Sequence, residues 1–204
     1  MSEIQVDTVS EKTAASGVTV DGVLIKDSGI TIPSGGVLTL ASGASMSPAK
    51  GKVLQVVSSM YKGSGSTTSN TMVSTGLAGT ITPTSTSNKI LLHISFAMAG
   101  GGGDCGAWVQ LFKGGVLLSG SLADVQGSQR QGSTGIGYNA GDNNNSFNYL
   151  DSPQATVATT YTLMYAISPG RPAGQTLYIN KVVTTDASYY STSPATMILM
   201  EIEG

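Results

Sequence analysis

The chain has 204 residues, of which 40% are hydrophobic and 11% are charged, and its formal net charge at pH 7 is -2. This length allows one domain of ordinary size, about 100 to 150 residues, and an appendage. Ten basic and twelve acidic residues, with no cluster of Lys or Arg, exclude the basic surface of a nucleic-acid-binding protein. The hydrophobic content argues against a disordered chain, although 27 residues are glycine.

The single cysteine, Cys105, and the single histidine, His93, restrict the chemistry of the chain. One cysteine forms no disulfide within the chain and supplies no set of thiolate ligands for zinc. We therefore expect no metal and no cofactor, and we expect packing and association to provide the stability. The apolar runs fall far short of the roughly 20 residues that cross a bilayer, and the first residues lack the features of a signal peptide. These features predict a product of the cytoplasm without membrane insertion.

Residues 1–41 are predicted to form a stem that needs other copies of the chain. Short β-rich stretches at residues 4–9, 17–22, 29–35 and 36–40 are separated by Gly, Asp and Pro, which favour tight turns. A segment of about 40 residues rarely folds alone without disulfides, metal or oligomerisation. We therefore expect three copies to associate about a common axis, with four apolar side chains of the stem in their contacts: Ile30, Ile32, Leu38 and Leu40.

Two motifs of this stem, IQVDTV at residues 4–9 and AASGVTVDGVLIKDSGI at residues 14–30, resemble the N-terminal stem of tailed-bacteriophage fibre proteins, especially those of marine and cyanobacterial phages. Two later motifs, SNKILLHISF at residues 87–96 and ATMILMEI at residues 195–202, are similar to phage-fibre head domains of the β-sandwich type. The resemblance implies a virion protein that attaches through its stem. Its expected partners are two further copies of the chain, other virion proteins of the tail, baseplate or capsid, and a host surface glycan or protein.

Residues 42–52 contain small residues and Pro48 and are predicted to be a linker, so that residues 53–204 form a head domain. The strongest strand pattern is at residues 89–98, where every second side chain is large and apolar. The fold class that we expect is all-β, with an antiparallel, jelly-roll-like β-sandwich head after the stem. Further strands are predicted at residues 53–58, 107–113, 116–118, 147–150, 161–167, 176–183 and 196–202, with a loop at residues 63–70.

The last predicted strand is apolar on both faces. Met197 and Leu199 alternate with Ile198, Met200 and Ile202, as expected for a strand that is covered on both sides. We assign one face to neighbouring subunits and place Met197 and Leu199 in the trimer interface. The alternative is a second layer contributed by the same chain.

The titratable residues give little support for catalysis. His93 lies within a predicted strand, where a structural or interface role is expected, and three copies of it could form a ring near a trimer axis that titrates or holds an ion. Cys105 follows a run of four glycines without the Gly-Lys-Ser/Thr of a phosphate-binding loop. A glycoside hydrolase uses a pair of carboxylates. Here the acidic residues after the linker occur singly in sequence, so we expect no enzyme.

Two predicted loops combine Tyr, Asp and Asn, residue types that stack on sugar rings and bond to hydroxyl groups. They are residues 138–145 and 186–191, and ordinary turn chemistry is the alternative explanation for both. The receptor-binding residues that we predict are Asp142, Asn143, Asn144, Asn145, Asp186, Tyr189 and Tyr190.

The sequence thus predicts a homotrimeric fibre or fibre-tip protein of a phage virion. One alternative is a trimeric sugar- or protein-binding module of the tumour-necrosis-factor or complement-head type outside any virus. A less favoured alternative is a glycan hydrolase.

Overall fold

The computed structural model describes residues 51–101, 106–124, 127, 131–136, 143–168, 175–181 and 193–204. All of them belong to the compact unit Pro48–Gly204. The predicted stem and most of the predicted linker lie outside these residues, so the assignment of Ile30, Ile32, Leu38 and Leu40 to a trimer contact stays a prediction. Four of the predicted receptor-binding residues also lie outside the described residues, as does Cys105: Asp142, Asp186, Tyr189 and Tyr190.

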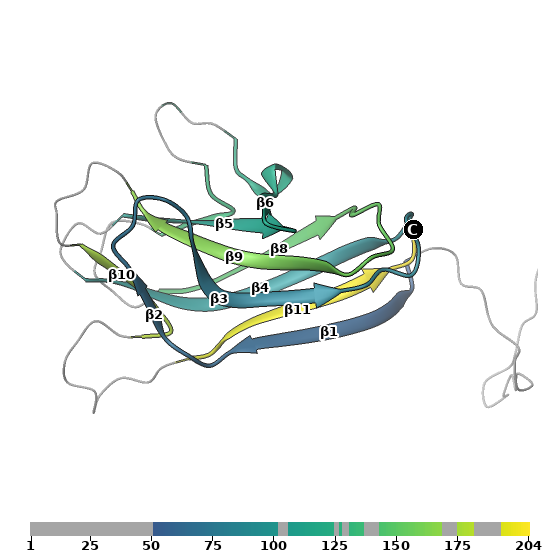
Figure 1. The fold of residues 1–204 in the computed structure, drawn as a ribbon, viewed down its shortest axis with the longest axis horizontal. Coiled ribbons are helices and arrows are strands. Elements are labelled where there is room, and N and C mark those ends of the chain that lie inside the picture. Colours follow the sequence, from purple (N-terminus) through teal and green to yellow (C-terminus); the bar gives the residue numbers. More distant parts are fainter. Residues whose placement is uncertain are drawn as a thin grey trace, which may run out of the picture. The chain divides into compact units, whose positions relative to one another are not determined.

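The described residues form β-strands and one 3-10 turn, η1 (Ser119–Ser121), with no α-helix among them (Figure 1). The strands in chain order are β1 (Val53–Tyr61), β2 (Gly65–Thr67), β3 (Val73–Ile81), β4 (Lys89–Gly101), β5 (Ala107–Lys113), β6 (Val116–Leu117), β7 (Thr134–Ile136), β8 (Asn143–Asp151), β9 (Thr159–Ile167), β10 (Thr176–Ile179) and β11 (Ala195–Ile202).

The strands pair in two antiparallel sheets. Sheet A contains β1, β11, β4, β10 and β2 in that order, and β8 also pairs with β4. Residues 90–95 of β4 pair with both β11 and β8, so these two strands lie on opposite sides of β4. The long strands of sheet A therefore run in the order β1-β11-β4-β8.

Sheet B has the order β3-β9-β5, with β6 and β7 on the far side of β5. Most of the long strands alternate between the sheets along the chain: β1 in A, β3 in B, β4 in A, β5 in B, β8 in A, β9 in B and β11 in A (Figure 1). Connected in this way, the strands β1-β11-β4-β8 of sheet A and β3-β9-β5-β7 of sheet B form a jelly roll. The predicted all-β antiparallel sandwich is confirmed.

The core lies between the two sheets and is made by alternate residues of their strands. Ile90, Leu92, Ile94, Phe96 and Met98 of β4 are at most 2% exposed. Sheet B contributes Leu77, Val109, Leu111, Tyr161 and Leu163, which are all at 0%. The alternation predicted for residues 89–98 is therefore confirmed, because one face of a central strand is fully covered by the opposite sheet.

Met197 and Leu199 of β11 also lie in this core, at 0% exposure. Both face β3, where Gly79 makes room for them: a Cβ at Gly79 would lie 3.0 Å from Cδ1 of Leu199 and 3.2 Å from the sulfur of Met197. The prediction that these two side chains contact neighbouring subunits is wrong, because sheet B of the same chain already covers them. The other face, with Ile198, Met200 and Ile202, points away from the sandwich.

Three strands, β2, β3 and β7, were not predicted from the sequence. β2 lies within residues 63–70, which were predicted as a loop, and β3 carries small residues at most of its positions. The strand predicted at residues 176–183 ends at Ile179, because Asn180 has a φ of 53°. The amide nitrogen of the Asn180 side chain then donates hydrogen bonds of 2.9 Å and 3.0 Å to the carbonyl oxygens of Tyr61 and Gly63.

Candidate functional site

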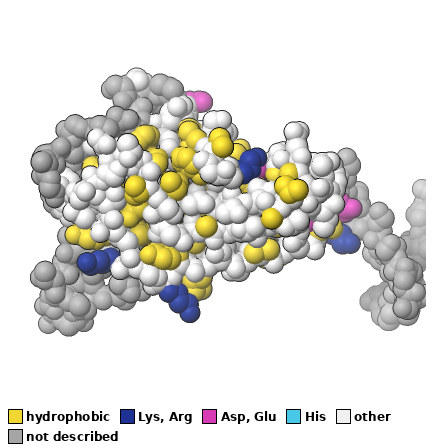
Figure 2. Space-filling model, in the orientation of Figure 1, with side chains coloured by type: hydrophobic (Ala, Val, Ile, Leu, Met, Phe, Trp, Pro, Cys, Tyr) yellow, Lys and Arg dark blue, Asp and Glu magenta, His cyan; other side chains and the backbone are white. Residues whose placement is uncertain are grey.

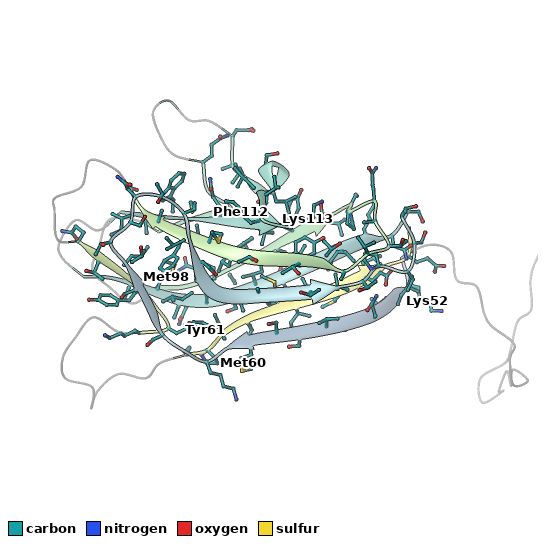
Figure 3. All side chains as sticks on the ribbon, viewed as in Figure 1. Lys52, Met60, Tyr61, Met98, Phe112 and Lys113 are labelled. Atoms are coloured by element: carbon teal, nitrogen blue, oxygen red, sulfur yellow. The ribbon has the colours of Figure 1, made fainter. Side chains whose placement is uncertain are left out.

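The two ends of the sandwich carry different parts of the chain. At one end, the backbone nitrogen of Gly51 donates to the oxygen of Glu203 (3.1 Å), and the nitrogen of Glu203 donates to the oxygen of Lys52 (2.9 Å). The first described residues therefore lie beside the last ones. Figure 3 shows Lys52 at this end, with Met98 and Tyr61 toward the opposite end.

The described strand ends nearest in sequence to the two predicted recognition loops lie at that opposite end. Met98 of β4 pairs with Asn143, the first residue of β8, on one side, and with Ile179, the last residue of β10, on the other side. The stretch 138–145 leads into β8, and the stretch 186–191 follows β10. The strand ends that flank these two stretches are thus neighbours, although about 40 residues separate them in the sequence.

The predicted receptor-binding asparagines differ from the expectation in one respect. Asn143, Asn144 and Asn145 belong to strand β8, where they pair with Met98, Ala97 and Phe96, and not to a loop. The ladder with β4 supplies backbone hydrogen bonds that override the turn preference of asparagine. Asn144 is exposed and Asn145 is half-buried. The other predicted receptor residues, Asp142, Asp186, Tyr189 and Tyr190, lie outside the described residues.

The outer face of sheet A, which points away from sheet B, is the most unusual surface of the described residues. Pairing across β1, β11, β4 and β8 places Val56, Met200, Leu91 and Leu150 side by side. We call these four residues the apolar row. Val56 is 58% exposed and Leu150 is 49% exposed. The apolar character of β11 is visible in the sequence, but this row is not, because its members come from four strands that are distant in the sequence.

Neighbouring positions extend this face. Ile198, Ile202 and Met60 lie on the same side as the apolar row, and Met60 is 52% exposed. Figure 3 shows Met60 on the outer side of β1. Among the described residues that pair on the outer face, Lys89 is the only Asp, Glu, Lys or Arg. Figure 2, in the same orientation, shows few charged side chains on the side of the molecule that faces the viewer.

His93 lies in the next row of the outer face, between Ile198 of β11 and Asn148 of β8. Its Nδ1 atom is 2.5 Å from Oδ1 of Asn148, and the ring is exposed. This contact orients the ring on the surface of the sheet.

A shallow hollow of about 440 Å³ opens at the end of this face near Gly51, lined in part by Lys89, Leu150, Ile202 and Glu203. The hollow is continuous with the apolar row through Leu150.

The carboxylate of Glu201 is fully buried and satisfied by hydrogen bonds. Its Oε1 atom accepts from the side-chain nitrogen of Asn88 (2.6 Å), the backbone nitrogen of Thr84 (2.6 Å) and the hydroxyl of Thr84 (2.8 Å), and its Oε2 atom accepts from Gln55 (2.5 Å). Burial alone would raise the pKa of Glu201, but the bonds from Asn88, Gln55 and Thr84 outweigh it and lower the pKa to about 2.

The carboxylate of Asp151 joins the two sheets. Lys113 of β5 contacts both of its oxygens, at 3.1 Å and 2.9 Å, and the hydroxyl of Tyr161 on β9 donates to Oδ2 at 2.6 Å. Burial, and next the hydrogen bond to Asp151, raise the pKa of Tyr161 far above its ordinary value. Asp151 and Glu201 thus both take part in contacts that stabilise the fold.

Among the described residues, no group of three His, Cys, Asp or Glu side chains lies close enough to hold a metal ion. The described part of the chain also has no helix that is long and apolar enough to span a membrane.

No family model matches the chain, and no curated protein sequence matches it. Among solved structures, it is similar to three structures of infectious bursal disease virus: the VP2 subviral particle (12% identity, TM-score 0.40), the Gx strain (14%, 0.39) and the derived T=1 particles (11%, 0.40). The matches cover 82%, 81% and 82% of this chain. The chain spans about two fifths of the chains it matches, at 42%, 42% and 40% of their lengths.

Proposed function

We propose that this chain is a structural component of a phage virion, a homotrimeric fibre or fibre-tip protein that attaches to the particle through residues 1–41 and contacts the host surface with its jelly-roll head. The resemblance of residues 4–9 and 14–30 to fibre stems supports the attachment. Jelly rolls occur in viral capsid proteins and in lectins, although a fold alone does not determine a function.

The observation that carries this proposal is the polarity of the head. Gly51, the first described residue, lies beside Glu203 at one end of the sandwich. The strand ends that flank the predicted recognition stretches, at Asn143 and Ile179, lie at the other end beside Met98. An attachment protein needs this separation, because the end that leads to the particle and the end that meets the host must not compete for space.

A role in binding without catalysis is part of the same proposal. The two buried carboxylates among the described residues, Asp151 and Glu201, are each engaged by at least two donors within the sandwich. Retaining and inverting glycosidases need two carboxyl groups that flank a substrate, about 5 to 9.5 Å apart. Carboxylates that already bind Lys113 or Asn88 are poorly suited to that task. We expect a reducing-sugar assay on host polysaccharide to detect no released sugar.

Two measurements test the attachment role. Immunogold electron microscopy of purified particles should label a fibre or its tip, and purified protein added before infection should reduce adsorption by competing for the receptor. Particles that lack the protein in mass spectrometry would contradict the proposal.

Recognition by the head is tested separately with the variant Tyr189→Ala/Tyr190→Ala, since loss of two aromatic contacts is worth about 1 kcal/mol each. Several copies on one particle amplify the loss through avidity. Adsorption should therefore fall strongly. The matched control is Tyr178→Ala on β10, at the same end of the sandwich. Equal adsorption by the two variants would dismiss residues 186–191 as the contact.

A further inference from the structure

We infer that the free edge of β8, the side turned away from β4, is a contact between two copies of the chain. At this edge, β8 of a second copy adds to sheet A in antiparallel orientation across a twofold axis, so that two sheets A form one continuous sheet. The contact lies on the head and uses none of the residues predicted to form the trimer of the stem. It therefore goes beyond the proposed function and does not depend on it.

β8 is a long edge strand, and no other described strand pairs with its free edge. It pairs with β4 from Asn143 to Asp151 without a register shift. Natural sheets protect such edges with proline, lysine, a bulge or a cover. β8 contains no proline and no lysine, and its only charged residue is Asp151, whose carboxylate is held by Lys113. The edge therefore keeps its capacity to pair with another strand.

The other long edges of the sandwich are closed. On β1, the side chains of Gln55 and Ser59 donate to two carbonyl oxygens at or directly after β3, those of Thr82 (2.8 Å) and Ala78 (2.5 Å). Both strands also contain a register shift. The remaining edge strands, β2, β6 and β7, have only three, two and three residues. Among the described residues, β8 is thus the long edge that lacks protection.

The direction of the backbone groups of β8 follows from a hydrogen bond on the opposite side of β4. Met98 pairs with β8 on one side and with β10 on the other. On the β10 side, the nitrogen of Asn180 donates to the oxygen of Ala97 (2.9 Å). Backbone groups of successive strand residues point to opposite sides, so the even-numbered residues of β4 face β8. Their partners in β8, such as Phe147 opposite Ile94, bond to β4, and the even-numbered residues of β8 turn their backbone groups outward.

Three of these outward-facing residues are Ser146, Asn148 and Leu150, and their side chains are exposed. They offer three N–H donors and three carbonyl acceptors in the plane of sheet A. No other strand in the described part of the chain bonds to them. A row of donors and acceptors of this kind is satisfied by another extended strand.

An identical β8 fits this edge. A twofold axis at Asn148 places it opposite the partner's Asn148 and places Ser146 opposite the partner's Leu150. Phe147 then faces the partner's Tyr149 in a non-hydrogen-bonded pair, in which side chains approach most closely. Both rings are half-buried on the inner side of β8. Aromatic pairs at such positions stabilise antiparallel sheets, and the symmetry provides two of them.

The charge pattern also favours an identical partner. Residues 143–150 contain no Asp, Glu, Lys or Arg, so a charged strand finds no complementary charge along this edge, and two identical edges meet without repulsion. Asp151 would face the partner's Asn145. The two Asp151 carboxylates would then lie about 20 Å apart along the strands.

Disulfide trapping in the full chain tests this contact. Cys105→Ser first removes the native thiol, and Asn148→Cys then places a thiol beside the axis. The Cα atoms of a hydrogen-bonded pair lie about 5.5 Å apart, which a disulfide can span. Oxidation should therefore convert most of the protein into covalent dimers on a non-reducing gel. Ser146→Cys is the matched control, because its two thiols would lie about 13 Å apart and should give at least about fivefold less dimer.

Paired charges give a second readout in the Asn148→Cys background. Ser146→Lys with Leu150→Lys opposes like charges at two positions of the contact and should lower the dimer yield at least about fivefold. Ser146→Lys with Leu150→Glu places opposite charges at the same positions and should preserve the yield. All variants should keep the far-ultraviolet circular dichroism spectrum of the unmodified chain, because the substituted side chains are exposed.

Equal dimer yields from Asn148→Cys and Ser146→Cys would reveal unspecific oxidation and overturn the contact. Absence of covalent dimers from Asn148→Cys would also overturn it, and would leave the edge of β8 to a strand of another protein or to none. Equal yields from the two charge variants would overturn the register. None of these results alters the proposed virion role, which the labelling of particles tests.

Discussion

The side-chain nitrogen of Asn88 donates a hydrogen bond of 2.6 Å to the carboxylate of Glu201, which joins the connection between β3 and β4 to the last strand of the chain. The same carboxylate accepts from Thr84 in that connection and from Gln55 on β1. One ionised group therefore holds together three segments that are distant in the sequence. Removal or protonation of the Glu201 carboxylate should therefore destabilise the whole sandwich.

Stability should depend on Glu201 in the acid range. Its pKa is lowered from 4.5 to about 2 in the folded chain, so the unfolded chain binds the proton more tightly. The stabilisation from this group is complete above about pH 4.5 and is lost as the pH falls toward 2. The free energy of unfolding should fall by about 3 kcal/mol over this range. Urea unfolding between pH 7 and pH 2 measures the loss. Glu201→Gln should be less stable at pH 7 and show a flatter pH profile, so parallel profiles for the two proteins would contradict the assignment.

The contact between Tyr161 and Asp151 should stabilise the packing of the two sheets. Tyr161→Phe removes a hydrogen bond to a buried carboxylate and should lower the free energy of unfolding by about 1 to 3 kcal/mol. Asp151→Asn also removes the ion pair with Lys113. A double-mutant cycle with both substitutions should give a coupling energy of about 1 kcal/mol or more. Strictly additive effects would show that the hydroxyl and the carboxylate contribute independently.

Gly76 should tolerate no side chain. It has a φ of 91°, and a Cβ there would lie 2.7 Å from the ring of Tyr61. The ring cannot move away easily, because a Cβ at Gly63 would also lie 2.9 Å from it. Gly76→Ala therefore combines backbone strain of about 1 to 2 kcal/mol with a steric clash. Gly115→Ala is the matched control, because Gly115 has a φ of 80° and open space around it. Thermal unfolding should show a larger loss of stability for Gly76→Ala than for Gly115→Ala.

The sandwich class and the strand at residues 89–98 could be predicted because a run of large apolar side chains alternated with a period of two. The same pattern is weak in β3, whose buried positions include Thr75 and Gly79 beside Leu77 and Ile81. Small residues there serve close packing against β11 and leave little signal in the sequence. For the same reason the orientation of β11 was predicted wrongly. Two apolar faces indicate that a strand is covered on both sides. Which face packs against the opposite sheet depends on the strands with which it pairs.

The candidate site was predictable only in part. The apolar row joins Val56, Leu91, Leu150 and Met200, and each of them is a single apolar residue within its own strand. Their adjacency follows from strand order and register, which are set by long-range pairing. The polarity of the head likewise depends on Met98 pairing with both Asn143 and Ile179. These relationships do not exist in any local stretch of sequence.

The head should fold without the residues that precede it. Its core is built from residues of β3, β4, β5, β9, β10 and β11, all within residues 53–204. A shortened chain that begins at Lys52 keeps the hydrogen bond from the nitrogen of Glu203 to the oxygen of Lys52, which closes that end of the sandwich. We expect this shortened chain to unfold cooperatively, with a melting temperature within a few degrees of that of the full chain. Leu199→Asp in the same background should abolish the transition, since it buries an unpaired charge between the sheets.

The shortened chain also tests where attachment to the particle resides. If residues 1–41 make that contact, particles assembled with the shortened chain in place of the full one should lack the fibre in electron micrographs. The protein itself should remain folded and soluble in the same lysate, which separates a loss of attachment from a loss of stability. Normal decoration of the particles by the shortened chain would instead assign attachment to the head, at a surface other than the strand ends around Met98.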